Sequence, residues 1–258
     1  MPKEQAEKKG REALTKALEL DFGSAEAHNT SAEYLSTEYK FVDAEKEFKK
    51  AISINPNYSL AHHWYSICLL EMGKLEDGFE ETRLAQELDP LSPTLASNMA
   101  INYSNMGKFA EAEEQLRKLK ELDTANQFVD FTLALIADEK MDWEVAVTHT
   151  EDALKRHPNN NGYLAILGYF YGKLGMVEKA NGILEKVKAI PEGTGGKPFN
   201  LATVYWGLGQ FDEMFRQLNL AIDERSMLFR VLRLSSDNQV KTDPRYGQLF
   251  ERVGLSPS

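Results

Sequence analysis

The chain has 258 residues, of which 42% are hydrophobic and 27% charged, a composition typical of a folded protein. Its formal net charge of -10 argues against a nucleic-acid-binding protein, which needs a basic surface, and against binding to an anionic membrane. Its single cysteine excludes an intrachain disulfide framework, and no apolar run reaches the roughly 18 residues of a membrane-inserted helix.

Residues 1–24 contain one amphipathic stretch, QAEKKGREALTKALELDF, at residues 5–22. Further along, the chain repeats every 34 residues, as described below. Counted back by this period, Gly10, Leu14, Ala17 and Phe22 match residues of the second helix of each repeat and of the turn after it. We expect residues 1–24 to form a half-repeat or an N-terminal cap helix. The chain is then either a piece of a longer protein or one that begins with a natural half-unit.

Residues 25–228 repeat with a period of 34 residues, without an insertion, over six units. The period is marked by prolines, by glycines and by small residues: Pro56, Pro90 and Pro158; Gly73, Gly107, Gly175 and Gly209; Ala44, Gly78, Ala112, Ala146 and Ala180. A fixed period of this length predicts helical units that stack side by side, each in contact with its neighbours only.

We number the positions of each unit from 1 to 34, starting at Ala25. Positions 4, 7, 8 and 11 have the spacing of one helix face, and positions 20, 24 and 27 form the buried face of a second helix. A small residue at position 8 lets the helices lie close together. A glycine at position 15 serves the turn between them, and a proline at position 32 ends the second helix.

These recurring positions resemble the tetratricopeptide repeat, and the resemblance covers roughly residues 25–228. It implies an all-α fold, a right-handed superhelical solenoid of helix-turn-helix repeats, and a non-catalytic role in protein–protein interaction. The position that is tryptophan in the family carries other residues here: His28, His62, Ala96, Asp130, Leu164 and Pro198.

Residues 229–258 leave the 34-residue rhythm, and we expect them to form a C-terminal capping segment. Asp243 and Pro244 can open a short helix that turns Leu249, Phe250 and Val253 inward. The phrases AEKEFKKAISINPNYSLAHHWY, AQELDPLSP and DPRYGQLFERVGL are similar to repeat arrays that follow winged-helix, protein kinase or nucleotide cyclase domains in bacterial proteins. This resemblance implies the regulatory part of a larger protein.

Four residue groups suggest chemistry, and each has a simpler interpretation. His28 and His62 share position 4 but lack metal-ligand spacing, so we expect them to fill the tryptophan position. The stretch from Gly193 to Lys197 lacks the Ser or Thr and the strand of a phosphate loop, and is expected to be a turn. Asp138–Asp142 lacks the glycine of a calcium loop, and Cys68 has no catalytic partner. We therefore expect no enzymatic activity, no cofactor and no metal site.

First helices line the concave side of such an array through positions 2, 5, 9, 12 and 13, which are polar in early units and aromatic in later ones. Aromatic anchors carry most of the energy of many interfaces. We predict that a protein or peptide partner binds in this groove to thirteen residues: Asn29, Glu33, His63, Ile67, Ile101, Phe128, Phe131, Leu135, Tyr169, Lys173, Phe199, Thr203 and Trp206. Alternatively, the C-terminal segment folds back over units five and six and buries the same rings.

One specialised binding mode is not expected. Tetratricopeptide domains that hold acidic chaperone tails use basic residues on successive first helices, whereas the matching positions here carry Asn29, Glu33, Trp64, Ser97 and Ile101. A carboxylate clamp for a chaperone tail is therefore not predicted.

Three functions stay open at this point. We favour an adaptor, scaffold or sensory module that binds a peptide or partner helix. A regulatory domain that contacts its own neighbouring domain is the first alternative, and a small-molecule or metal sensor is the second. We expect a cytoplasmic protein, or a periplasmic one if a membrane anchor lies upstream.

Overall fold

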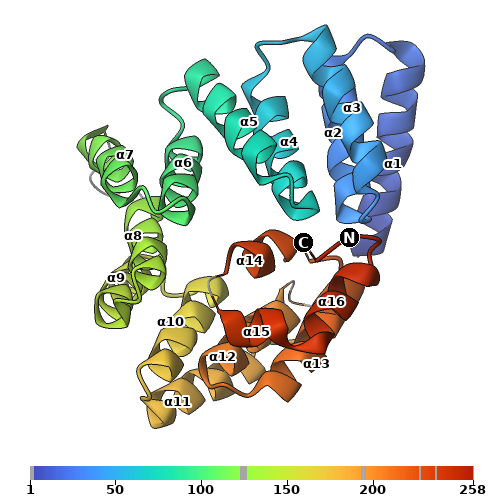
Figure 1. Cartoon of the computed structure of the whole chain (residues 1–258). Helices are drawn as coiled ribbons and strands as arrows, with labels where there is room; N and C mark the ends of the chain where they lie inside the picture. The colour runs from blue at the N-terminus through green and yellow to red at the C-terminus, as the bar shows by residue number, and fades with distance from the viewer. Residues whose placement is uncertain are drawn as a thin grey trace. The chain divides into compact units, whose positions relative to one another are not determined.

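The computed structural model describes residues 3–122, 127–192, 194, 196–226, 228–235 and 237–257, and in these ranges all regular secondary structure is helical (Figure 1). The all-α class predicted from the sequence is confirmed. The chain divides into two compact units, Met1–Pro90 (unit 1) and Leu91–Ser258 (unit 2). None of the described helices is both long enough and apolar enough to span a membrane.

Unit 1 holds a leading helix and two helix pairs. The helices are α1 (Lys3–Leu20), α2 (Ala25–Thr37), α3 (Phe41–Ile54), α4 (Ser59–Met72) and α5 (Leu75–Leu88). The partners within each pair, α2 with α3 and α4 with α5, pack along their lengths, and α3 also packs on α4. These pairs coincide with the first two predicted repeats.

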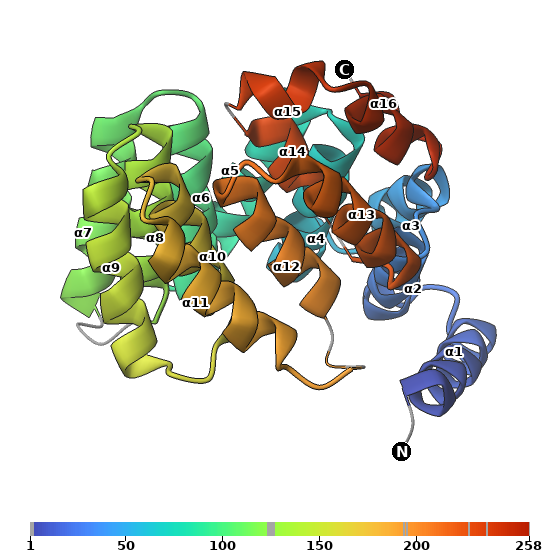
Figure 2. The same ribbon diagram turned by 90° about the horizontal axis from the view of Figure 1, so that it is seen from below.

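Unit 2 holds four further pairs and a C-terminal segment. The pairs are α6 (Pro93–Asn105) with α7 (Phe109–Leu122), α8 (Gln127–Glu139) with α9 (Trp143–Arg156), α10 (Asn161–Lys173) with α11 (Val177–Lys188), and α12 (Lys197–Gly207) with α13 (Phe211–Asp223). Figure 2 shows the first three of these pairs side by side, in the order of the chain. The segment consists of α14 (Phe229–Leu234), α15 (Asn238–Thr242) and α16 (Pro244–Glu251).

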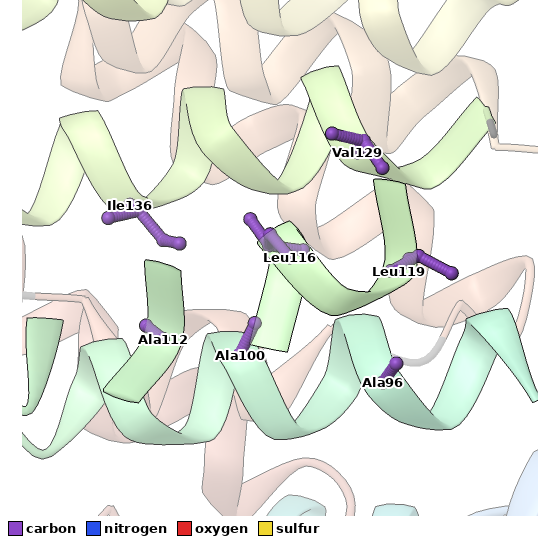
Figure 3. Close-up of a cluster of buried hydrophobic side chains, with 7 residues drawn as sticks. All are labelled: Ala96, Ala100, Ala112, Leu116, Leu119, Val129 and Ile136. Carbon is purple, nitrogen blue, oxygen red and sulfur yellow. The ribbon is translucent and has the colours of Figure 1, made fainter. Parts of the chain in front are cut away.

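Small residues at fixed positions allow the helices of a pair to approach closely. Position 8 carries Ala100 and position 20 carries Ala112, and both side chains are completely buried. Figure 3 shows how α6, α7 and α8 share one hydrophobic core: Ala96, Ala100, Ala112, Leu116, Leu119, Val129 and Ile136. The second helix of one repeat is thus buried between the first helices of two repeats, which is how a stacked array removes apolar surface from water.

The turn within each pair requires a left-handed backbone at position 15. Four repeats place a glycine there with positive φ: Gly73, Gly107, Gly175 and Gly209. The other two repeats place Tyr39 (φ 60°) and Met141 (φ 57°) at this position, and for these residues the conformation costs energy because the Cβ crowds the backbone. The left-handed backbone at position 15 therefore occurs in all six repeats, including the two in which the residue is not glycine.

The end of the chain follows the prediction in part. Asp243 caps α16 by accepting a hydrogen bond from the backbone N–H of Arg245 at 2.9 Å, and Leu249 and Phe250 are buried as expected. Val253 lies beyond the helix and is half-buried. Helices α14 and α15 were not predicted, because residues 229–242 carry no repeat register. The division into segments 1–24, 25–228 and 229–258 stays a prediction.

Candidate functional site

Two glycines bring helices α10 and α12 of unit 2 into backbone contact. A Cβ on Gly172 would lie 2.3 Å from the carbonyl carbon of Gly207, and one on Gly207 would lie 2.3 Å from the carbonyl oxygen of Tyr169. No side chain fits in that space, so the two first helices meet only because both residues are glycine. The close approach sets the distance between the side chains that flank it.

Three residues predicted to face a partner meet beside this contact. The rings of Tyr169 and Trp206 are in edge-to-face geometry, with centroids 5.9 Å apart and an interplanar angle of 76°. The ammonium Nζ of Lys173 lies 5.4 Å from the centroid of the Tyr169 ring, within cation–π range. The structure therefore brings Tyr169, Lys173 and Trp206 together on α10 and α12.

A carboxylate from the C-terminal segment occupies the point where these three residues converge. Lys173 Nζ donates to Asp237 Oδ2 at 2.7 Å, and Trp206 Nε1 donates to the same oxygen at 2.9 Å. The other oxygen, Oδ1, caps α15 by accepting from the backbone N–H groups of Gln239 at 3.0 Å and Val240 at 3.4 Å. Although burial opposes ionisation, the hydrogen bonds from Lys173 and Trp206 lower the pKa of Asp237.

Two further carboxyl groups reach the same place from the end of α8. Trp143 Nε1 donates to Asp138 Oδ1 at 3.0 Å. Burial raises the pKa of Asp138 to about 6, and burial together with the neighbouring Asp138 charge raises the pKa of Glu139 to about 7. We call the whole group the Asp237 site: Asp138, Glu139, Tyr169, Lys173, Trp206 and Asp237.

At Trp206 the structure agrees with the predicted alternative in which the C-terminal segment covers the aromatic rings, whereas Tyr169 and Phe199 are half-buried. Trp206 is only 7% exposed, and its indole N–H is bonded to Asp237. Binding of a partner at Tyr169, Lys173 and Trp206 stays a prediction, and it now requires that Asp237 move away.

The remaining predicted residues of unit 2 lie on the first helices α6, α8 and α12. Phe131 stacks on Tyr163 with ring centroids 4.7 Å apart, and Thr203 Oγ1 donates to the carbonyl oxygen of Phe199 at 2.9 Å. All of these side chains are half-buried: Ile101, Phe128, Phe131, Leu135, Phe199 and Thr203. Half-buried aromatic residues combine a fixed position with a face that a partner can cover.

The four predicted residues of unit 1 lie apart from this set in the chain, on α2 and α4. Asn29 Nδ2 donates to Glu33 Oε1 at 2.6 Å, and burial raises the pKa of Glu33. His63 is buried and Ile67 is half-buried. Unit 1 therefore has a polar pair, with Asn29 buried, where unit 2 has aromatic rings. Partner binding at these four residues stays a prediction.

The histidines at position 4 are structural. His62 Nδ1 lies 2.6 Å from Glu81 Oε2 and its Nε2 lies 3.0 Å from the carbonyl oxygen of Pro56. His28 makes the same two contacts one repeat earlier, with Glu47 at 2.7 Å and the carbonyl oxygen of Phe22 at 3.0 Å. Both ring nitrogens of His62 face acceptors, and the hydrogen bond to Glu81 raises the pKa of His62, so the geometry there fits a doubly protonated imidazole.

The other groups with possible chemistry also have structural partners. Within the described ranges no three His, Cys, Asp or Glu side chains gather as a metal site. Gly193 and Gly195 lie outside the described residues, whereas Lys197 Nζ donates to Glu192 Oε1 at 2.6 Å. Burial raises the pKa of Cys68 to about 12, which fits the expected inert thiol. Asp130 forms an ion pair with Arg156, which accounts for a charged residue at position 4.

Sequence reasoning missed Asp237 and the role of the two glycines as site components. Asp237 lies outside the repeat register, so no position rule assigned it. Asp138 and Glu139 did fall at the inward positions 12 and 13, and their adjacency was the available signal for an acidic part of the site.

The comparisons with known proteins agree with the fold. Residues 47–80 and residues 96–126 each match a family model described as "Tetratricopeptide repeat". The TPR repeat-containing protein YpiA of Bacillus subtilis (strain 168) is 23% identical over 193 residues, which are 75% of this chain and 45% of that protein. The chain thus spans less than half the length of this curated relative.

Two solved structures have the same fold. A tetratricopeptide repeat protein from Parabacteroides merdae ATCC 43184 aligns with a TM-score of 0.64 at 12% identity, over 83% of this chain and 84% of that one. PilW, a "widely conserved type IV pilus biogenesis factor", aligns with a TM-score of 0.60 at 20% identity, over 78% of this chain and 91% of that one. At these identities the likeness extends to the fold alone.

Proposed function

We propose that this chain, a protein built of tetratricopeptide repeats, is a non-catalytic protein–protein interaction module. The observation that supports it most is that the first helices α8, α10 and α12 carry half-buried aromatic residues: Phe128, Phe131, Tyr169 and Phe199. Such side chains bury large apolar areas on binding and lose little conformational entropy, because few of their bonds rotate.

The partner that fits is a peptide or an amphipathic helix lying across α8, α10 and α12. The apolar face of the partner would cover these aromatic residues, and its polar residues would contact the Asp237 site. The inner face of unit 1 is polar around Asn29 and Glu33, so the strongest contribution is assigned to unit 2.

Site-directed photo-crosslinking in the source cell tests this proposal. A photoreactive phenylalanine analogue replaces Phe131 or Phe199 on the predicted binding face, and Val145 or Val177, which are exposed on second helices, as controls. The same crosslinked protein is expected from both inner positions and from neither control. Equal crosslinking at all four positions, or none at the inner pair, contradicts the proposal.

The resemblance of residues 243–255 to repeat arrays that follow winged-helix, protein kinase or nucleotide cyclase domains supports a more specific version of this function. In that version the chain is a regulatory module in the cytoplasm whose partner is a neighbouring domain of the same polypeptide. Sequencing the genomic frame upstream of Met1 tests it. A fused winged-helix, kinase or cyclase domain is the expected result, and a stop codon with an independent promoter is the contrary one.

A further inference from the structure

The Asp237 site has the chemistry of a binding site that already holds a ligand. Two donors from two different repeats, the Lys173 ammonium and the Trp206 indole, converge on one carboxylate oxygen. A charged donor and a buried neutral donor on the same oxygen form a strong and directional contact. The acceptor comes from α15, which is not part of the repeats.

The residue that fills the site is held by few other contacts. Helix α15 has five residues, of which only Val240 is buried, and four are exposed: Asn238, Gln239, Lys241 and Thr242. Among the described residues, Lys241 Nζ also donates to the carbonyl oxygen of Arg233 at 2.8 Å, and the backbone N–H of Asp237 donates to Ser235 Oγ at 3.1 Å. The Lys241 ammonium also lies near enough to Glu139 to lower the pKa of that carboxyl in part. A segment with so little buried apolar surface opens locally at a small cost in free energy.

The helices on either side of α15 are anchored much more firmly. Phe229 and Leu232 of α14 and Leu249 and Phe250 of α16 are all buried, and Phe229 and Phe250 are in ring contact at 4.9 Å. Residues 237–242 can therefore move away from α10 and α12 while Asp243 still caps α16 and the rest of the C-terminal segment keeps the last repeat covered.

We propose that Tyr169, Lys173 and Trp206 form a carboxylate receptor, filled here by Asp237 of the same chain, that accepts in its place an aspartate capping a helix of a protein partner. This inference rests on the proposed function and adds the chemistry of the ligand. The partner residue is an aspartate at a helix start because Asp237 binds with one oxygen while its other oxygen caps α15.

The receptor differs from a purely structural contact in what happens when Asp237 is removed. If the contact is purely structural, the protein becomes less stable and does not gain affinity for an added carboxylate. A receptor gains affinity for a carboxylate supplied by another molecule, because its competitor within the chain is gone.

The test uses the full chain and a fluorescent peptide of residues 235–243 as the probe. In the variant Asp237→Ser the serine still caps α15, but the receptor is empty. We expect this variant to bind the peptide about tenfold more tightly than the natural chain does, and about tenfold more tightly than it binds the same peptide with Asp237→Asn. Equal binding of the acidic and amide peptides overturns the proposal.

A second substitution locates the binding. Adding Lys173→Met to Asp237→Ser should abolish the gain, whereas adding Lys186→Met, which removes the same charge from the exposed side of α11, should leave it. Equal effects of the two lysine substitutions would mean non-specific attraction and would overturn the proposal. If Asp237→Ser loses helical circular dichroism, Asp237→Asn in the protein replaces it, with the same expected order of affinities.

Failure of this test is distinguishable from failure of the proposed function. Crosslinking at Phe131 and Phe199 reports a partner whether or not a carboxylate enters the receptor. The peptide experiment needs no natural partner at all.

Discussion

Units 1 and 2 use the repeat position next to the inter-repeat turn in different ways. In unit 1, His28 and His62 occupy position 4 of successive repeats and make matching contacts to a glutamate and a carbonyl oxygen. In unit 2 position 4 is different in every repeat, and the buried polar contacts gather instead at the Asp237 site. The histidine contacts recur every 34 residues and stabilise the repeats. The contacts to Asp237 occur at one place only among the described residues and involve the C-terminal segment, and they define the candidate site.

The largest effect is expected where α10 and α12 touch. Gly207→Ala places a methyl group 2.3 Å from a backbone atom of Tyr169, so the helices must separate. We expect the free energy of unfolding of this part of unit 2 to fall by about 3 kcal/mol. Amide hydrogen exchange in α10 and α12 measures the loss.

Gly182→Ala is the matched control, because no atom lies within 4 Å of its added Cβ. This exposed position in the middle of α11 should gain about 0.5–1 kcal/mol from the better helix propensity of alanine. If Gly207→Ala behaved like Gly182→Ala, the glycine contact would not set the geometry of the site.

The second prediction concerns unit 1, where the stability of the helices around His62 should depend on pH. The hydrogen bond to Glu81 raises the pKa of His62 above its usual value, although burial opposes this. The stabilisation is therefore complete below the unfolded-state pKa of about 6.5, and it is lost as the pH rises through the higher folded-state pKa. We expect the protection of α4 and α5 amides to fall over that range.

The variant His62→Phe should be less stable at low pH and should lack this pH dependence. His149 supplies a control of opposite sign, because burial lowers its pKa and its contribution is lost as the pH falls below about 6.5. A natural chain whose α4 and α5 protection does not change with pH would show that His62 is not protonated in the fold.

A third expectation concerns ligand binding at the Asp237 site. The pKa of Asp138 is raised to about 6 and that of Glu139 to about 7. Asp138 lies near Lys173 and Asp237, and Glu139 lies near Asp138 and Lys241. In the Asp237→Ser variant the Asp237 charge that helps to raise the pKa of Asp138 is gone. Entry of another carboxylate raises that pKa again, so binding takes up protons. Affinity of the Asp237→Ser variant for the acidic peptide should rise severalfold from pH 8 to pH 6, measured by fluorescence anisotropy. An affinity that falls over this range contradicts the assignment of the acidic neighbours.

The smallest effect tests the repeat framework itself. Met141 adopts φ 57° at position 15 and is largely exposed, so Met141→Gly should stabilise its repeat by about 1 kcal/mol. Met106, one position before the glycine of the preceding repeat, has φ -85°, so Met106→Gly should destabilise by a similar amount. Thermal denaturation measures both effects: the melting temperature should rise in Met141→Gly and fall in Met106→Gly.

The framework was predictable because each of its rules is tested six times along the chain. Ala100, Ala112 and Leu116 were assigned to the core from position alone, and all three are buried.

Only the part of the site that lies within the repeats was predictable from the sequence. Tyr169, Lys173 and Trp206 follow from their inward positions, because helix periodicity fixes which face they share. Asp237 does not follow, because where a segment outside the period folds back depends on contacts distant in sequence. The role of Gly172 and Gly207 was hidden for a related reason: a glycine's function depends on which backbone approaches it, and the sequence does not state that distance.

The most direct measurement follows the indole N–H of Trp206 by nuclear magnetic resonance in the Asp237→Ser variant. The account predicts that acetate moves this resonance towards its position in the natural chain, while acetamide does not and the resonance of Trp64 in unit 1 stays in place. A Trp206 resonance that responds equally to acetate and acetamide, or to neither, would contradict a carboxylate receptor on α10 and α12.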